Sequence, residues 1–287
     1  MGFLNDPFMV RALIAAALVG VTAPAIGTYL VQRRQAIMGD GLGHVAMTGV
    51  ALGLVTNTSP VWMATLVAVV GAVAMEMIRS RGRTSGDVAL SLLFYGGLAG
   101  GVMIVNLGGS STSKLLGPMF GSITAVAPED VTAMALLAAF VLAVALGLRR
   151  QLFAVCQDEE FAKVTGLPVR LLNLLIAVTA AVTVTVAMRI VGLLLVSAMM
   201  VIPVAAAQRI TRGFAATLGL AIGISLTVSL VGTTATYYLN APSGAAIVLL
   251  AIAVFMALTA VSAPLARRRA ASARAAEEVC TRDDVTV

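Results

Sequence analysis

Long apolar segments alternate with short polar ones along almost the whole chain. The apolar segments have about 20 residues each, the length that an α-helix needs to cross the hydrocarbon core of a bilayer. The pattern predicts an all-α, polytopic transmembrane helical bundle of about nine spans, or of eight if two neighbouring segments form one. The expected spans are residues 8–31, 37–56, 61–79, 87–106, 128–148, 170–188, 190–208, 214–239 and 244–265.

The composition agrees with a multi-pass membrane protein. Of the 287 residues, 60% are hydrophobic and only 11% are charged, which excludes a soluble domain of this length. The first apolar segment lacks a small-residue cleavage site and is expected to be a retained span, not a signal peptide. We expect residues 1–266 to form the transmembrane domain and the polar residues 267–287 to form a disordered cytoplasmic tail.

The basic residues predict the orientation of the spans. The net charge is +6, but the basic residues lie in short clusters between apolar segments, which indicates membrane topology and argues against nucleic-acid binding. With nine spans, sixteen of the nineteen basic residues fall on one side. That side is therefore the cytoplasm, with the N-terminus outside. The least secure boundary is at Arg189, which must reach the outer surface in a tight turn or a re-entrant arrangement.

The run from Met38 to Met47 contains the only histidine of the chain. Asp40 and His44 are spaced i, i+4, so both side chains project from one helical face, about 6 Å apart along the axis. A carboxylate and an imidazole so placed can share a divalent cation. The alternative is structural, with Asp40 capping the helix and His44 bonding a carbonyl group. Met47 is expected to serve packing alone.

Two protein ligands are too few for tight zinc or manganese binding. Two copies of the chain that meet at a two-fold axis would bring together two Asp40 and two His44 side chains, a mixed nitrogen and oxygen ligand set. Alternatively, each subunit holds the ion with one pair and water. A transport site must also release its ion, so modest affinity is appropriate.

The segment of about residues 151–169 is expected to be the longest cytoplasmic loop. Asp158 can cap a short helix there, with the acidic Glu160 in its first turn, and Gly166 can end that helix. Phe161 and Val164 would then form a small exposed apolar face. This face indicates either docking to a partner or an ordinary amphipathic connector.

Other polar groups receive structural interpretations. Glu76 lies three residues before Arg79 near the inner surface, which favours an ion pair. Cys156 and Cys280 both fall in segments assigned to the cytoplasm, so no disulfide is expected. The chain has no G-x-x-x-x-G-K-[ST] phosphate loop and no H-E-x-x-H motif. Energy for transport would therefore come from an ion gradient or from a separate ATPase.

Three stretches resemble the permeases of bacterial ATP-binding-cassette importers for zinc, manganese or iron(II). The first combines Arg34 with Met38-Gly39-Asp40 and His44. The second is Asp158-Glu159-Glu160-Phe161-Ala162 followed by Gly166. The third runs from Val191-Gly192 to Pro203 and on to Ala207. Span number, spacing and polarity agree from about residue 8 to residue 266.

The resemblance implies a multi-pass protein of the bacterial cytoplasmic membrane that is not itself an enzyme and holds no permanent cofactor. It implies that Asp40 and His44 contact the transported divalent metal. It also implies that Asp158, Glu160, Phe161, Ala162 and Gly166 belong to the coupling segment. The expected partners are a second copy of the chain, cytoplasmic ATP-binding subunits, an extracytoplasmic metal-binding protein and the lipid bilayer.

The chain departs from the family pattern around the histidine. Gly43, Val45 and Thr48 stand where the family often has Ser or Ala, Ala or Ser, and Pro. These differences leave the ligand pair intact but bear on which metal is carried. Three rival functions remain at this stage: a proton-coupled secondary transporter, an importer permease for a metal chelate or vitamin, and a membrane enzyme with a metal site.

Overall fold

The structure is a computed structural model that describes residues 6–80, 86–109, 119, 121, 127–188, 191–239 and 242–261. Within these ranges every regular element is a helix, as predicted. Eight helices are long and apolar enough to cross a membrane. They are α1 (Pro7–Gln32), α2 (Met38–Val55), α3 (Pro60–Ser80), α4 (Gly86–Leu107), α6 (Pro128–Gly147), α9 (Val169–Ala187), α11 (Phe214–Leu239) and the helix Ser243–Val261.

The predicted span 190–208 is shorter than expected. Gly192, with φ +81°, precedes the single 3-10 turn η4 (Leu193–Leu195), and only then does α10 (Val196–Gln208) begin. Its 13 residues extend about 20 Å, less than the thickness of the hydrocarbon core. The eight full-length helices and the short α10 together account for the nine predicted spans. Arg189, the expected outer turn, lies outside the described residues.

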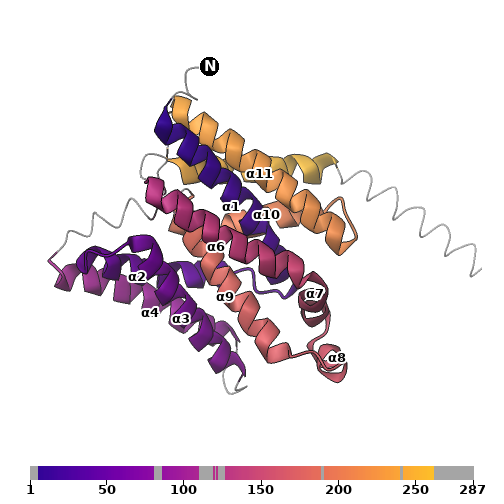
Figure 1. The fold of residues 1–287 in the computed structure, drawn as a ribbon. Coiled ribbons are helices and arrows are strands. Elements are labelled where there is room, and N and C mark those ends of the chain that lie inside the picture. The colour runs from indigo at the N-terminus through magenta and orange to yellow at the C-terminus, as the bar shows by residue number, and fades with distance from the viewer. Residues whose placement is uncertain are drawn as a thin grey trace, which may run out of the picture.

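The helices form two groups that α9 joins (Figure 1). One group contains α2, α3 and α4, and the other contains α1, α10 and α11. Helix α9 contacts α1, α2, α3 and α6, so it lies at the centre of the bundle. Helices α2 and α9 are the most buried of the spans, whereas α4 and the helix Ser243–Val261 are the least buried.

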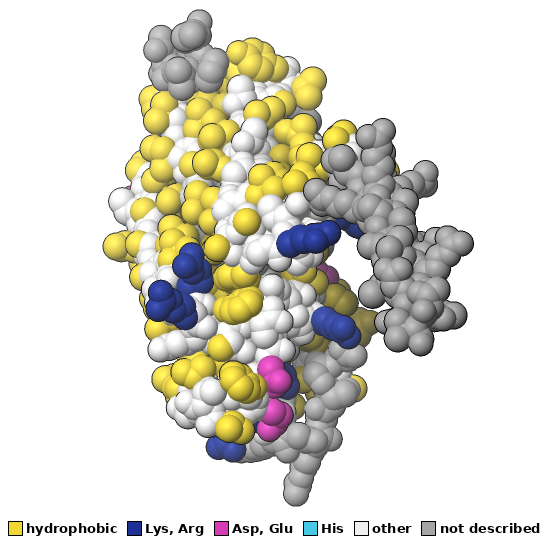
Figure 2. All heavy atoms as spheres, turned by 90° about the vertical axis from the view of Figure 1, so that its right-hand side faces the viewer, with side chains coloured by type: hydrophobic (Ala, Val, Ile, Leu, Met, Phe, Trp, Pro, Cys, Tyr) yellow, Lys and Arg dark blue, Asp and Glu magenta, His cyan; other side chains and the backbone are white. Residues whose placement is uncertain are grey.

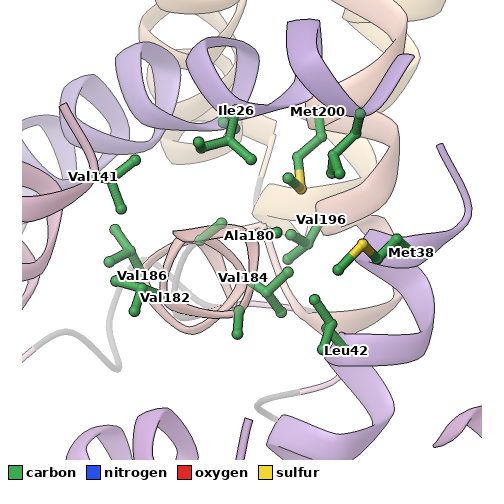
Figure 3. Close-up of a cluster of buried hydrophobic side chains, with 14 of the residues drawn as sticks. Ile26, Met38, Leu42, Val141, Ala180, Val182, Val184, Val186, Val196 and Met200 are labelled. Carbon is green, nitrogen blue, oxygen red and sulfur yellow. The ribbon is translucent and has the colours of Figure 1, made fainter. Parts of the chain in front are cut away.

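The inner half of α2 is part of the main hydrophobic core. Figure 3 shows Met38 and Leu42 of α2 facing Val196 and Met200 of α10, with Val184 of α9 beside them. All five side chains are buried. Apolar packing therefore holds the first two turns of α2, the part of the helix that carries Asp40.

Small residues allow α2 and α3 to approach each other closely. A Cβ atom at Gly49 of α2 would lie 2.5 Å from the Cα atom of Ala64 in α3, and one at Gly53 would lie 2.9 Å from the Cα atom of Pro60. Real Cβ contacts are never this short, so the approach of α2 to α3 requires glycine at both positions.

Charged side chains gather at one end of the bundle. On the face shown in Figure 2, the described Lys and Arg side chains lie from the middle of the molecule downward, and the upper part shows none. Helices α7 (Arg149–Gln157) and α8 (Glu159–Val164) lie at the same lower end in Figure 1. This distribution agrees with the predicted orientation. The predicted tail, residues 267–287, lies outside the described residues.

Candidate functional site

A tight turn connects α1 to the helix that carries Asp40 and His44. The backbone N–H of Arg34 donates to the carbonyl oxygen of Val31 (3.1 Å), and that of Gln35 donates to Leu30 (2.8 Å). These are the two hydrogen bonds of a Schellman motif. Arg34 has φ +58° at the position where glycine is usual. Helix α2 then begins at Met38, so its start is tied closely to the end of α1.

Asp40 lies in the first turn of α2 and is half-buried. Its backbone N–H donates to the carbonyl oxygen of Ile37 (3.1 Å). The N-cap residue, Ile37, makes no side-chain hydrogen bond, and Asp40 is the acidic residue of the first turn. A carboxylate here is favoured by the positive end of the helix dipole.

His44 lies one turn deeper and is 5% exposed. Its ring packs edge-on against Phe94 of α4, with ring centroids 4.2 Å apart. Its Nδ1 atom is buried and has no hydrogen-bond partner among the described residues. A buried, unpaired ring nitrogen costs about 1–3 kcal/mol, so Nδ1 of His44 is available to bind a water molecule or a cation.

Backbone contact between α2 and α4 holds His44 in place. A Cβ atom at Gly97 would lie 2.6 Å from the carbonyl carbon of His44 and 2.8 Å from its oxygen. The hydroxyl of Thr48 donates to the carbonyl oxygen of Gly97 (2.7 Å). Thr48, one of the departures from the family pattern, therefore strengthens this contact and leaves α2 a continuous helix.

A cavity of about 350 Å³ lies at the inner ends of α2, α3 and α4. Its lining includes Arg34, Arg79 and Phe94, the residue whose ring contacts His44. Arg79 makes the predicted ion pair with Glu76 through two hydrogen bonds of 2.8 and 2.9 Å. The cavity thus connects the charged inner surface with the neighbourhood of His44.

One chain supplies too few ligands for a closed metal site. In the described ranges, no three His, Cys, Asp or Glu side chains gather closely enough to hold a metal ion. The shortfall expected from the sequence therefore persists in the folded subunit. The ligand roles of Asp40 and His44 stay a prediction.

The cytoplasmic segment folds as the sequence predicts. The side chain of Asp158 accepts hydrogen bonds from the backbone N–H groups of Glu160 and Phe161, both at 3.0 Å, and so caps α8. Gly166, with φ +80°, ends the helix. There the N–H of Leu167 donates to the carbonyl oxygen of Ala162 (3.1 Å), so α8 is closed at both ends.

Helix α8 has one buried and one exposed side. Ala162 is buried, whereas Phe161 is 63% exposed and Val164 is 87% exposed. Lys163 bonds Glu160 across the helix surface (2.7 Å), and this hydrogen bond raises the pKa of the Lys163 amine. Two apolar side chains are therefore presented outward on a small, rigid helix.

The sequence did not point to Arg33 or Phe94. Arg33, which follows α1, forms an ion pair with Glu159 of α8 (3.8 Å), and Phe94 contacts His44. Both contacts join helices far apart in the chain. The sequence offered one signal for these contacts, the charge of Arg33. It was not specific, because a pair of basic residues is typical of any inner membrane surface.

The helical bundle, its basic inner end and the capped helix α8 define a multi-pass protein of the plasma membrane. The model of the ABC 3 transport family matches residues 5–262. The chain belongs to this family, which confirms the resemblance found in the sequence.

Relatives match over nearly their whole length. The chain is 30% identical to the "Probable metal transport system membrane protein" of Treponema pallidum, covering 90% of this chain and 97% of that protein. It is 29% identical to the "Manganese import system permease protein ScaB" of Streptococcus parasanguinis, with 93% and 95% covered. The solved structure "PsaBC from Streptococcus pneumoniae in complex with Fab" is similar with TM-score 0.81 and 28% identity, covering 90% of this chain and 93% of that chain.

Proposed function

We propose that this chain is the permease subunit of an ATP-binding-cassette importer that takes up a divalent transition metal, zinc, manganese or iron(II). The observation that carries the proposal is the buried Nδ1 atom of His44, which has no partner among the described residues and lies one helical turn from Asp40. Metal-import names among the relatives support the same substrate class. A neutral imidazole and a carboxylate suit these ions.

The ion is held between two copies of the chain. Each subunit contributes Asp40 and His44, and the two-fold axis doubles this pair into a four-ligand set. The absence of a third close ligand among the described residues supports this arrangement. The metal ion is cargo, so a site completed only when two subunits meet can open again and release it.

A separate ATPase subunit drives transport from the cytoplasmic side. The exposed face of α8, with Phe161 and Val164, is the docking surface for this subunit. The chain itself has no phosphate loop of the G-x-x-x-x-G-K-[ST] kind. ATP binding would shift α8, and the bundle would alternate between outward-open and inward-open states. An extracytoplasmic binding protein would deliver the metal.

The test is metal uptake into proteoliposomes that contain the permease with its co-expressed ATPase. Uptake of radiolabelled manganese, zinc and iron(II) is measured with and without ATP. We expect ATP-dependent uptake that falls at least about 10-fold in Asp40→Ala and in His44→Ala, since changing even the residues that hold metal ligands in place costs about 10–100-fold. Thr56→Ala, an exposed change at the outer end of α2, is the matched control.

Three results would contradict the proposal. Uptake that requires only a proton gradient would identify a secondary transporter. Normal metal uptake in both Asp40→Ala and His44→Ala would show that the ion passes elsewhere. Uptake of a metal chelate alone, unaffected by His44→Ala, would assign a chelate permease.

A further inference from the structure

A buried arginine connects α8 to the membrane-embedded helices. The side chain of Arg33, at the C-terminal end of α1, is 7% exposed. Its Nη2 atom lies 3.8 Å from Oε2 of Glu159, the first residue of α8. Glu159 is the one carboxylate within ion-pair distance of Arg33 among the described residues. A guanidinium that has lost its hydration depends strongly on such a counter-charge.

Neighbouring charges make this dependence stronger. Arg79 of α3 repels Arg33, while Glu159 and Glu76 attract it. Burial is the largest cause of the lowered pKa of Arg33, and the repulsion by Arg79 comes next. Without Glu159, the positive charge of Arg33 would therefore remain buried beside another positive charge.

Arg33 occupies the turn from which α2 starts. Its N–H donates to the carbonyl oxygen of Tyr29 (3.0 Å), and the next two residues form the Schellman hydrogen bonds already described. The N–H of Met38 then donates to Gln35 (3.0 Å) as α2 begins. A displacement of Arg33 must move this hydrogen-bonded turn, and Asp40 follows only seven residues later.

The two sides of α8 thus have different contacts. Glu159 faces Arg33, whereas Phe161 and Val164 are exposed. We propose that Arg33 is a positioning residue that transmits the displacement of α8 through the Arg33–Glu159 ion pair to the start of α2, and so to Asp40 and His44. This inference rests on the proposed function, in which a partner ATPase moves α8.

The experiment measures metal taken up per ATP hydrolysed, together with the amount of ATPase that co-purifies with the permease. The variants are Arg33→Gln, Glu159→Gln and the double variant. We expect each single change to lower uptake per ATP about tenfold, within the range of coupling energies between sites. The double variant is expected to be no worse than either single one, because both remove the same interaction.

Three further variants complete the design. The exchanged pair Arg33→Glu with Glu159→Arg is expected to recover part of the lost uptake, and Arg33→Lys should retain most of it. Arg170→Gln is the matched control, because Arg170 is an exposed arginine at the start of α9, outside the coupling residues and the proposed ion pair. It should leave uptake per ATP unchanged. Arg33→Lys and the exchanged pair provide the measurement if Arg33→Gln does not fold.

The possible failures can be told apart. If the wild-type complex shows no ATP-dependent metal uptake, the proposed function fails. If the wild type transports metal and Arg33→Gln keeps the same uptake per ATP, the inference is wrong although the function stands. If Arg33→Gln loses the ATPase subunit in proportion to its uptake, the ion pair serves docking and not transmission, which also overturns the inference.

Discussion

The ring of Phe94 packs edge-on against the imidazole of His44, with centroids 4.2 Å apart and ring planes at 64°. Phe94 also lines the cavity at the inner ends of α2, α3 and α4. It therefore separates the only histidine of the chain from a space that opens toward the charged inner surface. This contact restricts the imidazole and limits the access of water to it.

Replacing Phe94 should alter transport through His44. In Phe94→Ala the imidazole gains rotational freedom and water reaches it from the cavity, so we expect metal uptake with a KM raised about tenfold, which corresponds to about 1.4 kcal/mol. The measurement is uptake at varied metal concentration. Leu92→Ala, an exposed change on the same helix, is the control. An unchanged KM in Phe94→Ala would show that the ring has no part in holding the ion.

Gly97 should tolerate no side chain. In Gly97→Ala the new Cβ would lie 2.6 Å from the carbonyl carbon of His44, so α4 must move away from α2. We expect the variant to lose about 1–3 kcal/mol of stability, as overpacked sites do. Thermal unfolding in detergent measures this loss.

The adjacent glycine provides a matched control. A Cβ atom at Gly96 would meet nothing within 4 Å, so Gly96→Ala should unfold at the wild-type temperature or slightly above it. Equal effects of Gly96→Ala and Gly97→Ala would mean that close packing against His44 does not determine the requirement for glycine.

Phe161 should dominate the binding of the ATPase subunit. An exposed aromatic side chain on a capped helix is typical of residues that contribute most of the energy of an interface. We expect Phe161→Ala to weaken the complex at least 30-fold, or about 2 kcal/mol. Binding of the purified ATPase to the solubilised permease is measured, with the exposed Leu171→Ala as the control. Equal affinities would place the docking surface elsewhere.

Cys156 should resist alkylation in the folded protein. Burial raises the pKa of its thiol from 9.0 to about 11, so the thiol is protonated at pH 8. The reactive thiolate is then scarce, and maleimide labelling of a Cys280→Ser variant should be slow until the protein is unfolded. Rapid labelling at pH 8 under native conditions would contradict this expectation.

The Cys156 thiol also makes the free energy of unfolding depend on pH. Its folded-state pKa lies above the unfolded value, so its contribution is fully present below pH 9 and is lost as the pH rises toward 11. Unfolding of Cys280→Ser and of the same chain with Cys156→Ala, compared between pH 8 and pH 11, isolates this contribution. If the stability advantage of the chain with Cys156 over the chain with Cys156→Ala grew as the pH rose, this expected pH dependence would be wrong.

Much of the local structure is determined by neighbouring residues and could be predicted. The length of the apolar segments predicts the spans because a bilayer has a fixed thickness. The capped helix α8 also follows from local chemistry, since Asp158 and Gly166 act on residues within one turn of themselves. The ion pair between Glu76 and Arg79 lies within one helix as well.

Features that depend on helix packing could be found only in the tertiary structure. The burial of His44, its contact with Phe94 and the ion pair between Arg33 and Glu159 each depend on how distant helices approach one another. In an apolar chain many packings satisfy the same hydrophobic pattern. Glycines such as Gly97 select among them through close backbone contact.

The sequence by itself therefore determined that the chain spans the membrane, and it predicted which end is cytoplasmic and which two residues are the strongest metal-ligand candidates. Only the tertiary structure decided what surrounds those residues and how the cytoplasmic helix is joined to them. The reason is physical: hydropathy and capping act over a few residues, whereas a buried contact forms only when distant segments meet.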